Sequence, residues 1–400
     1  MARLSIDFGT SYCAAAWLSP ESGKPEAISF GADEYNNNKY YKFPSALIYA
    51  KDQAGNEDVI VGKQAYNQII SGKSCKNVCY KIKSEMRPQV TRQINGSPKR
   101  YEQIVADLFK AIKKRASDSC KQDFEEVTIT HPANFEYQQL LIDAADIAGW
   151  PENKVTLLEE PIAAIYGFSI NQQIPDNSGL VVFDYGGGTI DVTYLFKKSN
   201  NEFKWFFPPK GESKCGGEYI DLELYRYFCK LAKLEMSDLI NYELLNKCRA
   251  IKINFSTDQF LTSDRISIGD TIYAISRNKF NELIQIKTDR AIDVLSKVLQ
   301  ECKNQDKTID YLLLNGGSSK LPIIKESILK LGFNEDQLIS FDGEDIAVAL
   351  GGVAKYIENS QNKTTLKEKE NISKLVHNQR VSDLKFKDPI FDNFNFRKKI

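Results

Sequence analysis

The hydrophobic positions of the chain follow strand-like and helix-like patterns in alternation. Four short runs of apolar and β-branched residues predict strands at 4–8, 12–18, 180–184 and 190–196. Apolar side chains at helical spacing predict helices at 101–117, 138–147, 220–234 and 323–331. Strands that alternate with helices in this way are typical of an α/β protein.

The two pairs of predicted strands share one pattern. In each pair an aspartate ends the first strand and a glycine turn follows, as Asp7-Phe8-Gly9-Thr10 and as Asp184 to Thr189 (DYGGGT). A strand–turn–strand unit that occurs twice indicates an internal duplication. We therefore expect two similar halves that face each other across a cleft.

The composition is that of an ordinary soluble protein of two or three domains. The 400 residues contain 53 Lys and Arg against 53 Asp and Glu, and 42% are hydrophobic. This balance excludes a wholly basic nucleic-acid coat, and nothing specifically indicates nucleic-acid binding. No apolar run approaches the roughly 18–20 residues that span a membrane, and no secretory leader is recognisable. We therefore expect a cytoplasmic protein without membrane contact.

The eight cysteines are scattered along the chain. Cys75 and Cys79 form one C-x3-C pair, but no second Cys or His pair follows that would complete four zinc ligands. We therefore expect reduced thiols rather than a zinc site or a disulfide framework.

Two stretches carry an excess of positive charge. Residues 363–400 contain ten Lys and Arg against five Asp and Glu, within a tail at 360–400 that is rich in Asn, Lys and Phe. Residues 73–100 contain eight Lys and Arg and a single acid, Glu85. Each stretch is either a solvated surface or a docking segment for a protein partner.

Three glycine-bearing turns carry the candidate chemistry, at 7–12, 184–191 and 315–320. Glycine lets backbone N–H groups approach a polyanion because no Cβ stands in the way, and the neighbouring Thr and Ser add hydroxyl donors. An aspartate beside such a turn would repel phosphate but suits a hydrated Mg²⁺ bound to it. The third turn leads into a helix, and a helix N-terminus suits an anion or a nucleoside. These features predict a nucleotide site with Mg²⁺.

The turns and three further motifs stand in an order that resembles one family. The further motifs are Leu158–Gly167 (LEEPIAAIYG), Lys214–Asp221 (KCGGEYID) and Glu344–Gly352 (EDIAVALGG). From about residue 3 to 358, the chain resembles the nucleotide-binding half of the seventy-kilodalton heat-shock protein family, the DnaK-like chaperones. The resemblance implies the actin-like ATPase (ribonuclease-H-like) α/β fold, with two lobes, each of a core and an outer subdomain, around a nucleotide cleft.

The resemblance also implies domain boundaries. Lobe I is expected over 1–177, with its core at 1–40 and 105–177, its outer subdomain at 41–104 and a closing helix at 340–358. Lobe II is expected over 178–339, with its core at 178–218 and 290–339 and its outer subdomain at 219–289. The tail at 360–400 follows.

The matched motifs imply the binding residues. The phosphates would contact Gly9, Thr10, Ser11 and Tyr12 from one side, and Gly186, Gly187, Gly188 and Thr189 from the other. Asp7, Asp184 and Asp191 would hold hydrated Mg²⁺ and an accompanying monovalent cation such as K⁺ through water. The rest of the ATP or ADP would contact Gly217, Glu218, Lys252, Ser256, Gly316, Gly317, Ser318, Lys320 and Asp345.

The resemblance places the catalytic groups in the same motifs. Glu160 would orient the attacking water, and Thr189 and Asp184 would also take part in catalysis. Lys81 is the first choice for the family's catalytic lysine, and Lys83 is the alternative. Phosphoryl transfer needs positioning and charge neutralisation rather than covalent chemistry, which suits this set of side chains.

The chain departs from the family pattern at several positions. Arg249 stands where the adenine-binding helix normally carries Glu, and Lys320 stands where an Arg often stacks on adenine. Because lysine lacks the flat guanidinium, we expect weaker stacking on the base. Between Pro132 and Trp150 there is no Arg, although the chaperones use one there to relay the nucleotide state. A β-rich substrate-binding domain is not recognisable after the matched region.

The resemblance, together with the glycine turns, implies a stand-alone ATPase that hydrolyses ATP slowly and opens and closes its lobes with the nucleotide state. The alternative is a nucleotide-gated interaction module with little or no hydrolysis, which binds a protein through the 360–400 tail or the 73–100 stretch. Small-molecule kinases and filament-forming actin relatives share the fold, but the sequence shows no distinct acceptor base or pocket for a kinase.

Overall fold

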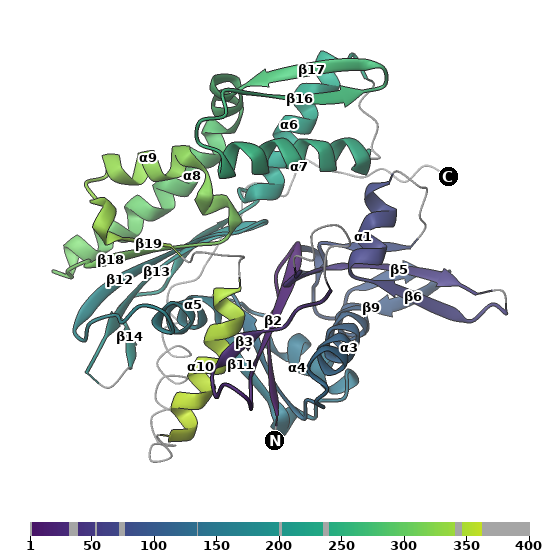
Figure 1. The fold of residues 1–400 in the computed structure, drawn as a ribbon, viewed down its shortest axis with the longest axis horizontal. Coiled ribbons are helices and arrows are strands. Elements are labelled where there is room, and N and C mark those ends of the chain that lie inside the picture. The colour runs from purple at the N-terminus through teal and green to yellow at the C-terminus, as the bar shows by residue number, and fades with distance from the viewer. Residues whose placement is uncertain are drawn as a thin grey trace. The chain divides into compact units, whose positions relative to one another are not determined.

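The computed structural model describes residues 2–31, 39–52, 54–71, 77–133, 135–199, 202–234, 240–340 and 346–361. Met1–Lys355 form one compact unit, and a second unit begins at Tyr356. The first unit is built on two six-stranded sheets, each with parallel and antiparallel pairs, and helices pack against both (Figure 1). This is the α/β architecture that the sequence predicts.

The first sheet has the strand order β11-β10-β1-β2-β3, and β4 pairs with β2. Its strands are β1 (Arg3–Asp7), β2 (Tyr12–Leu18), β3 (Pro25–Ala27), β4 (Lys42–Pro44), β10 (Glu126–His131) and β11 (Val155–Glu159). Helices α3 (Tyr101–Cys120) and α4 (Gln138–Ile147) share an apolar core with β1, in which the ring of Phe109 packs on that of Phe8. The turn between β1 and β2 therefore starts from a well-packed base.

The second sheet has the strand order β14-β13-β12-β18-β19, and β15 pairs with β13. Its strands are β12 (Ser178–Tyr185), β13 (Thr189–Lys197), β14 (Phe203–Trp205), β15 (Lys210–Ser213), β18 (Tyr311–Asn315) and β19 (Leu338–Ser340). β12 is apolar along most of its length because both of its faces are buried. Val181 and Phe183 face a cluster with α8 (Arg277–Asn304) and α9 (Pro322–Lys330), whereas Leu180 and Val182 face α5 (Glu160–Ser169).

Smaller elements extend from each sheet. Beside the first sheet lie β5 (Ala46–Lys51), β6 (Glu57–Val61), α1 (Lys63–Ile70), β7 (Val78–Tyr80), α2 (Ile82–Glu85), β8 (Thr91–Ile94) and β9 (Ser97–Arg100). Beside the second lie α6 (Gly217–Leu231), α7 (Tyr242–Thr257), β16 (Ser263–Ile268) and β17 (Thr271–Ser276). Because α1 packs against α7, these two outer sets touch each other. The lobe and subdomain boundaries given above stay predictions.

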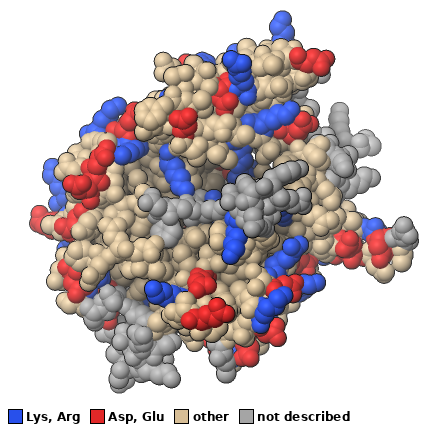
Figure 2. Space-filling model, in the orientation of Figure 1, with Lys and Arg blue, Asp and Glu red and all other residues tan. Residues whose placement is uncertain are grey.

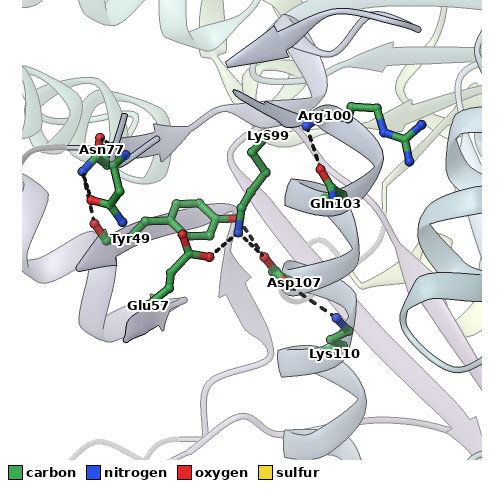
Figure 3. A network of polar contacts seen from close by, with 9 residues as sticks. Tyr49, Glu57, Asn77, Lys99, Arg100, Gln103, Asp107 and Lys110 are labelled. Atoms are coloured by element: carbon green, nitrogen blue, oxygen red, sulfur yellow. Dashed lines mark hydrogen bonds and ion pairs between the residues drawn. The ribbon is translucent and has the colours of Figure 1, made fainter. Parts of the chain in front are cut away.

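A polar network fixes the β8–β9 hairpin to its neighbours (Figure 3). The Tyr49 hydroxyl on β5 donates to Asp107 on α3 at 2.9 Å. The Lys99 ammonium lies 4.1 Å from the centroid of the Tyr49 ring, and it pairs with Glu57 on β6 and with Asp107. Burial and the adjacent Asp107 raise the pKa of Tyr49, so the hydroxyl keeps its proton and remains a donor. The charge of Lys99 therefore stabilises the packing of β9 against β5, β6 and α3.

Helix α10 (Ala347–Gln361) crosses α5 at very short distance. A Cβ built on Gly351 would lie 1.7 Å from the carbonyl oxygen of Ala163, and one on Gly167 would lie 2.0 Å from that of Ala347. Any side chain at these two glycines would push the helices apart. The helix predicted at 340–358 corresponds to α10, which begins at Ala347 in the structure, and residues 341–345 lie outside the described part.

Most of the predicted elements agree with the structure. The four predicted strands correspond to β1, β2, β12 and β13, and the helix predicted at 138–147 has the bounds of α4. The helix predicted at 220–234 ends earlier, at Leu231, because the chain turns at Lys233 with φ of 54°, and Leu234 is 43% exposed. In the described residues the seven cysteines are free thiols, and no helix there is long and apolar enough to cross a membrane.

Candidate functional site

The first two glycine turns lie against each other. The turn between β1 and β2 contributes Thr10 and Ser11, and the turn between β12 and β13 contributes Gly187 and Gly188. A Cβ on Gly187 would lie 2.9 Å from the Ser11 hydroxyl, and one on Gly188 would lie 3.4 Å from the Thr10 hydroxyl. Only residues without a side chain leave both hydroxyls this close to the opposite backbone. The structure thus brings together two turns that are about 177 residues apart in the sequence.

The third glycine turn joins the second. β18 runs parallel to β12, so Asn315 is the register partner of Asp184, and the turn begins at the same sheet edge. The Ser318 hydroxyl donates to the carbonyl oxygen of Gly186 at 2.9 Å. Gly316 has φ of 79°, and a Cβ there would lie 2.5 Å from the carbonyl oxygen of Tyr185. Glycine is therefore needed at this position both for its backbone conformation and for space.

Helix α6 starts in the same place. The N–H of Gly217 donates to the carbonyl oxygen of Gly186 at 3.0 Å, and that of Glu218 donates to Gly187 at 2.8 Å. A Cβ on Gly217 would lie 2.5 Å from the Ser318 hydroxyl. The second turn, the third turn and the start of α6 therefore form one continuous backbone surface.

Several carboxylates lie beside these turns. Asp184 and Asp191 are register partners on β12 and β13, and the Thr189 hydroxyl donates to Asp191 at 3.0 Å. Asp7 accepts a hydrogen bond from Thr130 at 3.3 Å. Burial and the nearby charge of Glu160 raise the pKa of Asp184 well above its usual range, and the same two causes raise that of Asp191 to about 6. Buried carboxylates whose pKa values are raised in this way are favourable partners for a cation.

This carboxylate set fits hydrated Mg²⁺ better than a directly bound ion. Among the described residues, no group of three or more His, Cys, Asp or Glu side chains is arranged to hold a metal by itself. Mg²⁺ commonly keeps several waters and takes few protein ligands, which is the mode expected for Asp7, Asp184 and Asp191. The raised pKa values of Asp184 and Asp191 are the observation that supports a cation here.

Lys83 is the cation that reaches the carboxylates. Its ammonium lies 2.5 Å from a carboxylate oxygen of Glu160, and the two side chains are 11% and 13% exposed. Burial tends to lower the pKa of Lys83, but Glu160, Asp7 and Asp184 outweigh it, so the pKa is raised and the group stays charged. The first choice from the sequence, Lys81, points elsewhere and pairs with Glu218 at 3.1 Å.

The residues predicted for the nucleoside lie on α7 and beside the third turn. Lys252 pairs with Asp221 at 2.7 Å and donates to the carbonyl oxygen of Gly217 at 2.8 Å. The Ser256 hydroxyl donates within α7 to the carbonyl oxygen of Lys252. Lys320 ends the short helix η2 (Gly317–Lys320) and is exposed, and Asp345 lies outside the described residues.

A family model for "Hsp70 protein" matches residues 6–363 of the chain. The chain belongs to the Hsp70 family. It is 28% identical over 341 residues to the chaperone protein DnaK of Nitrosopumilus maritimus, and this alignment covers 81% of this chain and 51% of that protein. It is 25% identical over 389 residues to a chaperone protein HscA homolog of Acinetobacter baumannii, and this alignment covers 91% of this chain and 59% of that protein. The chain thus spans about half to three-fifths of these relatives. The described structure has the actin-like ATPase fold of this family.

Arg249, which departs from the Hsp70 pattern, lies against aromatic residues of the first sheet and of the outer set beside it. Its guanidinium carbon is 4.8 Å from the centroid of the Tyr12 ring, and one nitrogen donates to the Tyr80 hydroxyl at 3.4 Å. The Tyr66 hydroxyl donates to Asn246 on the same helix at 2.8 Å. Sequence reasoning did not find Tyr66 and Tyr80, because isolated tyrosines carry no signal of a contact 180 and 169 residues away.

The basic stretch at 73–100 is mostly engaged in internal contacts. Lys81, Lys83 and Lys99 pair with acids, and Arg92 pairs with Glu85. Its first lysines, at 73 and 76, lie outside the described residues. On the face drawn in Figure 2, acidic and basic side chains are interspersed. These contacts favour a role within the chain, and not as a docking surface, for the described part of the stretch.

Proposed function

We propose that this chain binds Mg·ATP where the three glycine turns meet and hydrolyses it slowly. The observation that carries the proposal is the convergence of those turns with Lys83, Glu160 and the aspartates Asp7, Asp184 and Asp191. These groups come from five separate parts of the chain, and each matches a need of phosphoryl transfer. Membership of the Hsp70 family, whose named relatives include DnaK and HscA chaperones, supports the same function.

The phosphates of the nucleotide would lie between the first two turns. Gly9 to Tyr12 on one side and Gly186 to Thr189 on the other present N–H and hydroxyl donors. Mg²⁺, when bound, supplies positive charge to the phosphates, and its waters would be held by Asp7, Asp184 and Asp191. The carboxylates with raised pKa values would then be stabilised in their ionised forms.

The catalytic roles follow from the geometry at Glu160. Its carboxylate would orient the attacking water, and Lys83 would neutralise charge that develops on the γ-phosphate. We assign this lysine role to Lys83 instead of Lys81, because only Lys83 contacts Glu160 in the structure. Thr189, held by Asp191, would position the γ-phosphate from the opposite turn.

The nucleoside would lie between α7 and the third turn. Lys252 and Ser256 on α7 and Gly316 to Lys320 at η2 are the residues on the two sides of this site, since the two elements pack against each other. The base is expected to be adenine by family membership, with weak stacking because Lys320 lacks a flat guanidinium. Closure of the two halves around the nucleotide, and opening after hydrolysis, would be the motion that a partner protein reads.

Two substitutions test this function. Glu160→Gln and Thr189→Ala should each lower turnover about 100-fold, because each removes a group that acts on the γ-phosphate, while Mg·ATP affinity changes little. Turnover is measured with labelled ATP and affinity by calorimetry, with the exposed acid Glu282 on α8 changed to Gln as the control. If both site variants lost binding together with turnover, these residues would be structural and the proposed roles would be wrong.

A further inference from the structure

Glu218 holds its carboxylate against groups that suit phosphate. One carboxylate oxygen accepts a hydrogen bond from the Ser11 hydroxyl at 2.6 Å, in a buried contact. The other oxygen lies 3.1 Å from the ammonium of Lys81, and the side chains of Lys81 and Glu218 are 20% and 10% exposed. The Ser11 hydroxyl in the first glycine turn and the Lys81 ammonium, which would both suit a phosphate, therefore already contact Glu218.

The position of Glu218 is fixed by its backbone. It lies in the first turn of α6, where its N–H donates to the carbonyl oxygen of Gly187 at 2.8 Å. A Cβ on Gly187 would lie 2.9 Å from the Ser11 hydroxyl and 3.6 Å from Cγ of Glu218. The carboxylate therefore lies beside the contact between the first and second glycine turns.

A carboxylate at this point opposes a polyanion. Like charges repel strongly in a partly buried site, and each donor that Glu218 occupies must be shared with an incoming phosphate or released to it. The contact also joins Ser11 and Lys81, which belong to the half with the first sheet, to α6 beside the second sheet. Releasing it would loosen one connection between the halves.

We propose that Glu218 is an internal anion that takes the place of a nucleotide phosphate at Ser11 and Lys81 and is displaced when a nucleotide binds. This inference rests on the proposed function and adds a determinant of nucleotide affinity to it. Glu218 weakens binding of the polyphosphate, and it returns to Ser11 and Lys81 when the nucleotide leaves.

The test is calorimetric titration of Mg·ADP and Mg·ATP into the wild-type chain and Glu218→Gln. Removing the charge while keeping the side-chain shape should tighten binding roughly three- to tenfold. The matched control is Glu223→Gln on the same helix, which removes a carboxylate that pairs with Arg226 and Lys287 and not with Ser11 or Lys81, and it should leave affinity unchanged. In Glu218→Gln combined with Lys81→Met, part of the gain should disappear, because Lys81 is one of the released donors.

Unchanged or weaker binding by Glu218→Gln would overturn the inference and make Glu218 a supporting residue of the site. Failure of the wild-type chain to bind either nucleotide would instead refute the proposed function, so the two failures are distinguishable. If the variant does not fold, a crystal structure of the wild-type chain with Mg·ADP decides the question. The Ser11–Glu218 hydrogen bond should be broken there, and its persistence at 2.6 Å would contradict the displacement.

Discussion

The assignment of Lys83 as the catalytic lysine leads to a prediction that separates it from a lysine two positions away. Lys83→Met removes the cation that lies 2.5 Å from Glu160 and that also faces Asp7 and Asp184. Lys81→Met is the natural comparison, because it removes a cation of the same stretch that pairs with Glu218. The two variants have the same change of charge and size.

The expected magnitudes follow from burial and contact. Loss of one preorganised donor at a transition state lowers turnover by about 10²–10³, and we expect this loss for Lys83→Met. Breaking a buried pair costs about 3–5 kcal/mol of stability, and the partial exposure of 11% and 13% brings our estimate to about 2–3 kcal/mol. Lys81→Met should raise KM and leave turnover at saturating ATP within about tenfold, since Lys81 would contribute to binding.

The assay is single-turnover hydrolysis at saturating Mg·ATP for both variants, with urea unfolding of the nucleotide-free proteins in parallel. The difference in the free energy of unfolding between wild type and Lys83→Met should shrink as the pH falls toward 5. Buried carboxylates that have lost their cation bind protons more readily, and protonation removes the repulsion between them. A larger loss of turnover in Lys81→Met than in Lys83→Met would refute the assignment.

Two further predictions concern the acids and the third turn. The pKa of Asp191 is about 6 in the folded chain against a usual value of 3.8, so the folded state alone takes up this proton between those values. As the pH falls through 6, Mg²⁺ affinity measured by calorimetry should therefore fall, and the free energy of unfolding of the nucleotide-free chain should rise. Asp191→Asn should lack both of these contributions. If wild type and Asp191→Asn had identical pH profiles, Asp191 would not be the titrating group. Gly316→Ala should lower the free energy of unfolding by more than about 2 kcal/mol, because it adds a backbone clash to left-handed strain. Gly269 has φ of 58° and open space around it, so Gly269→Ala should cost only about 1 kcal/mol. Equal losses of the two variants in urea unfolding would contradict the clash.

The strands and the glycine turns could be predicted from the sequence because their signals are local. An aspartate at the end of an apolar run and a glycine after it mark a strand end directly. β1 ends at Asp7 and β12 ends one residue after Asp184, in agreement with this signal. Parallel pairing then brings residues such as Asp184 and Asn315 to one sheet edge. The meeting of the second and third glycine turns at one sheet edge could therefore be expected from the sequence.

The contacts of individual lysines could not be predicted in this way. Lys81 and Lys83 are two residues apart, and their spacing alone would place them on one face of a strand. In the structure Lys81 has left-handed backbone angles, with φ of 61°, at the start of α2, so the chain turns between them. The two ammonium groups consequently reach different acids, Glu218 and Glu160.

Arg249 shows a second limit of the sequence. Its place in the motif predicted an altered contact with the adenine base of the nucleotide, whereas its contacts in the structure are with Tyr12 and Tyr80. These partners belong to the half of the molecule with the first sheet, and they meet Arg249 where α1 packs on α7. A long-range contact between a cation and neutral rings leaves no pattern in a single sequence.

The measurement that tests the central claim most directly is single-turnover hydrolysis of Mg·ATP by the unmodified chain, with nucleotide binding recorded on the same sample. We expect saturable binding that depends on Mg²⁺, followed by slow release of phosphate. Binding without any hydrolysis would contradict the catalytic roles of Lys83 and Glu160. Absence of binding would contradict the claim that the three glycine turns form a nucleotide site.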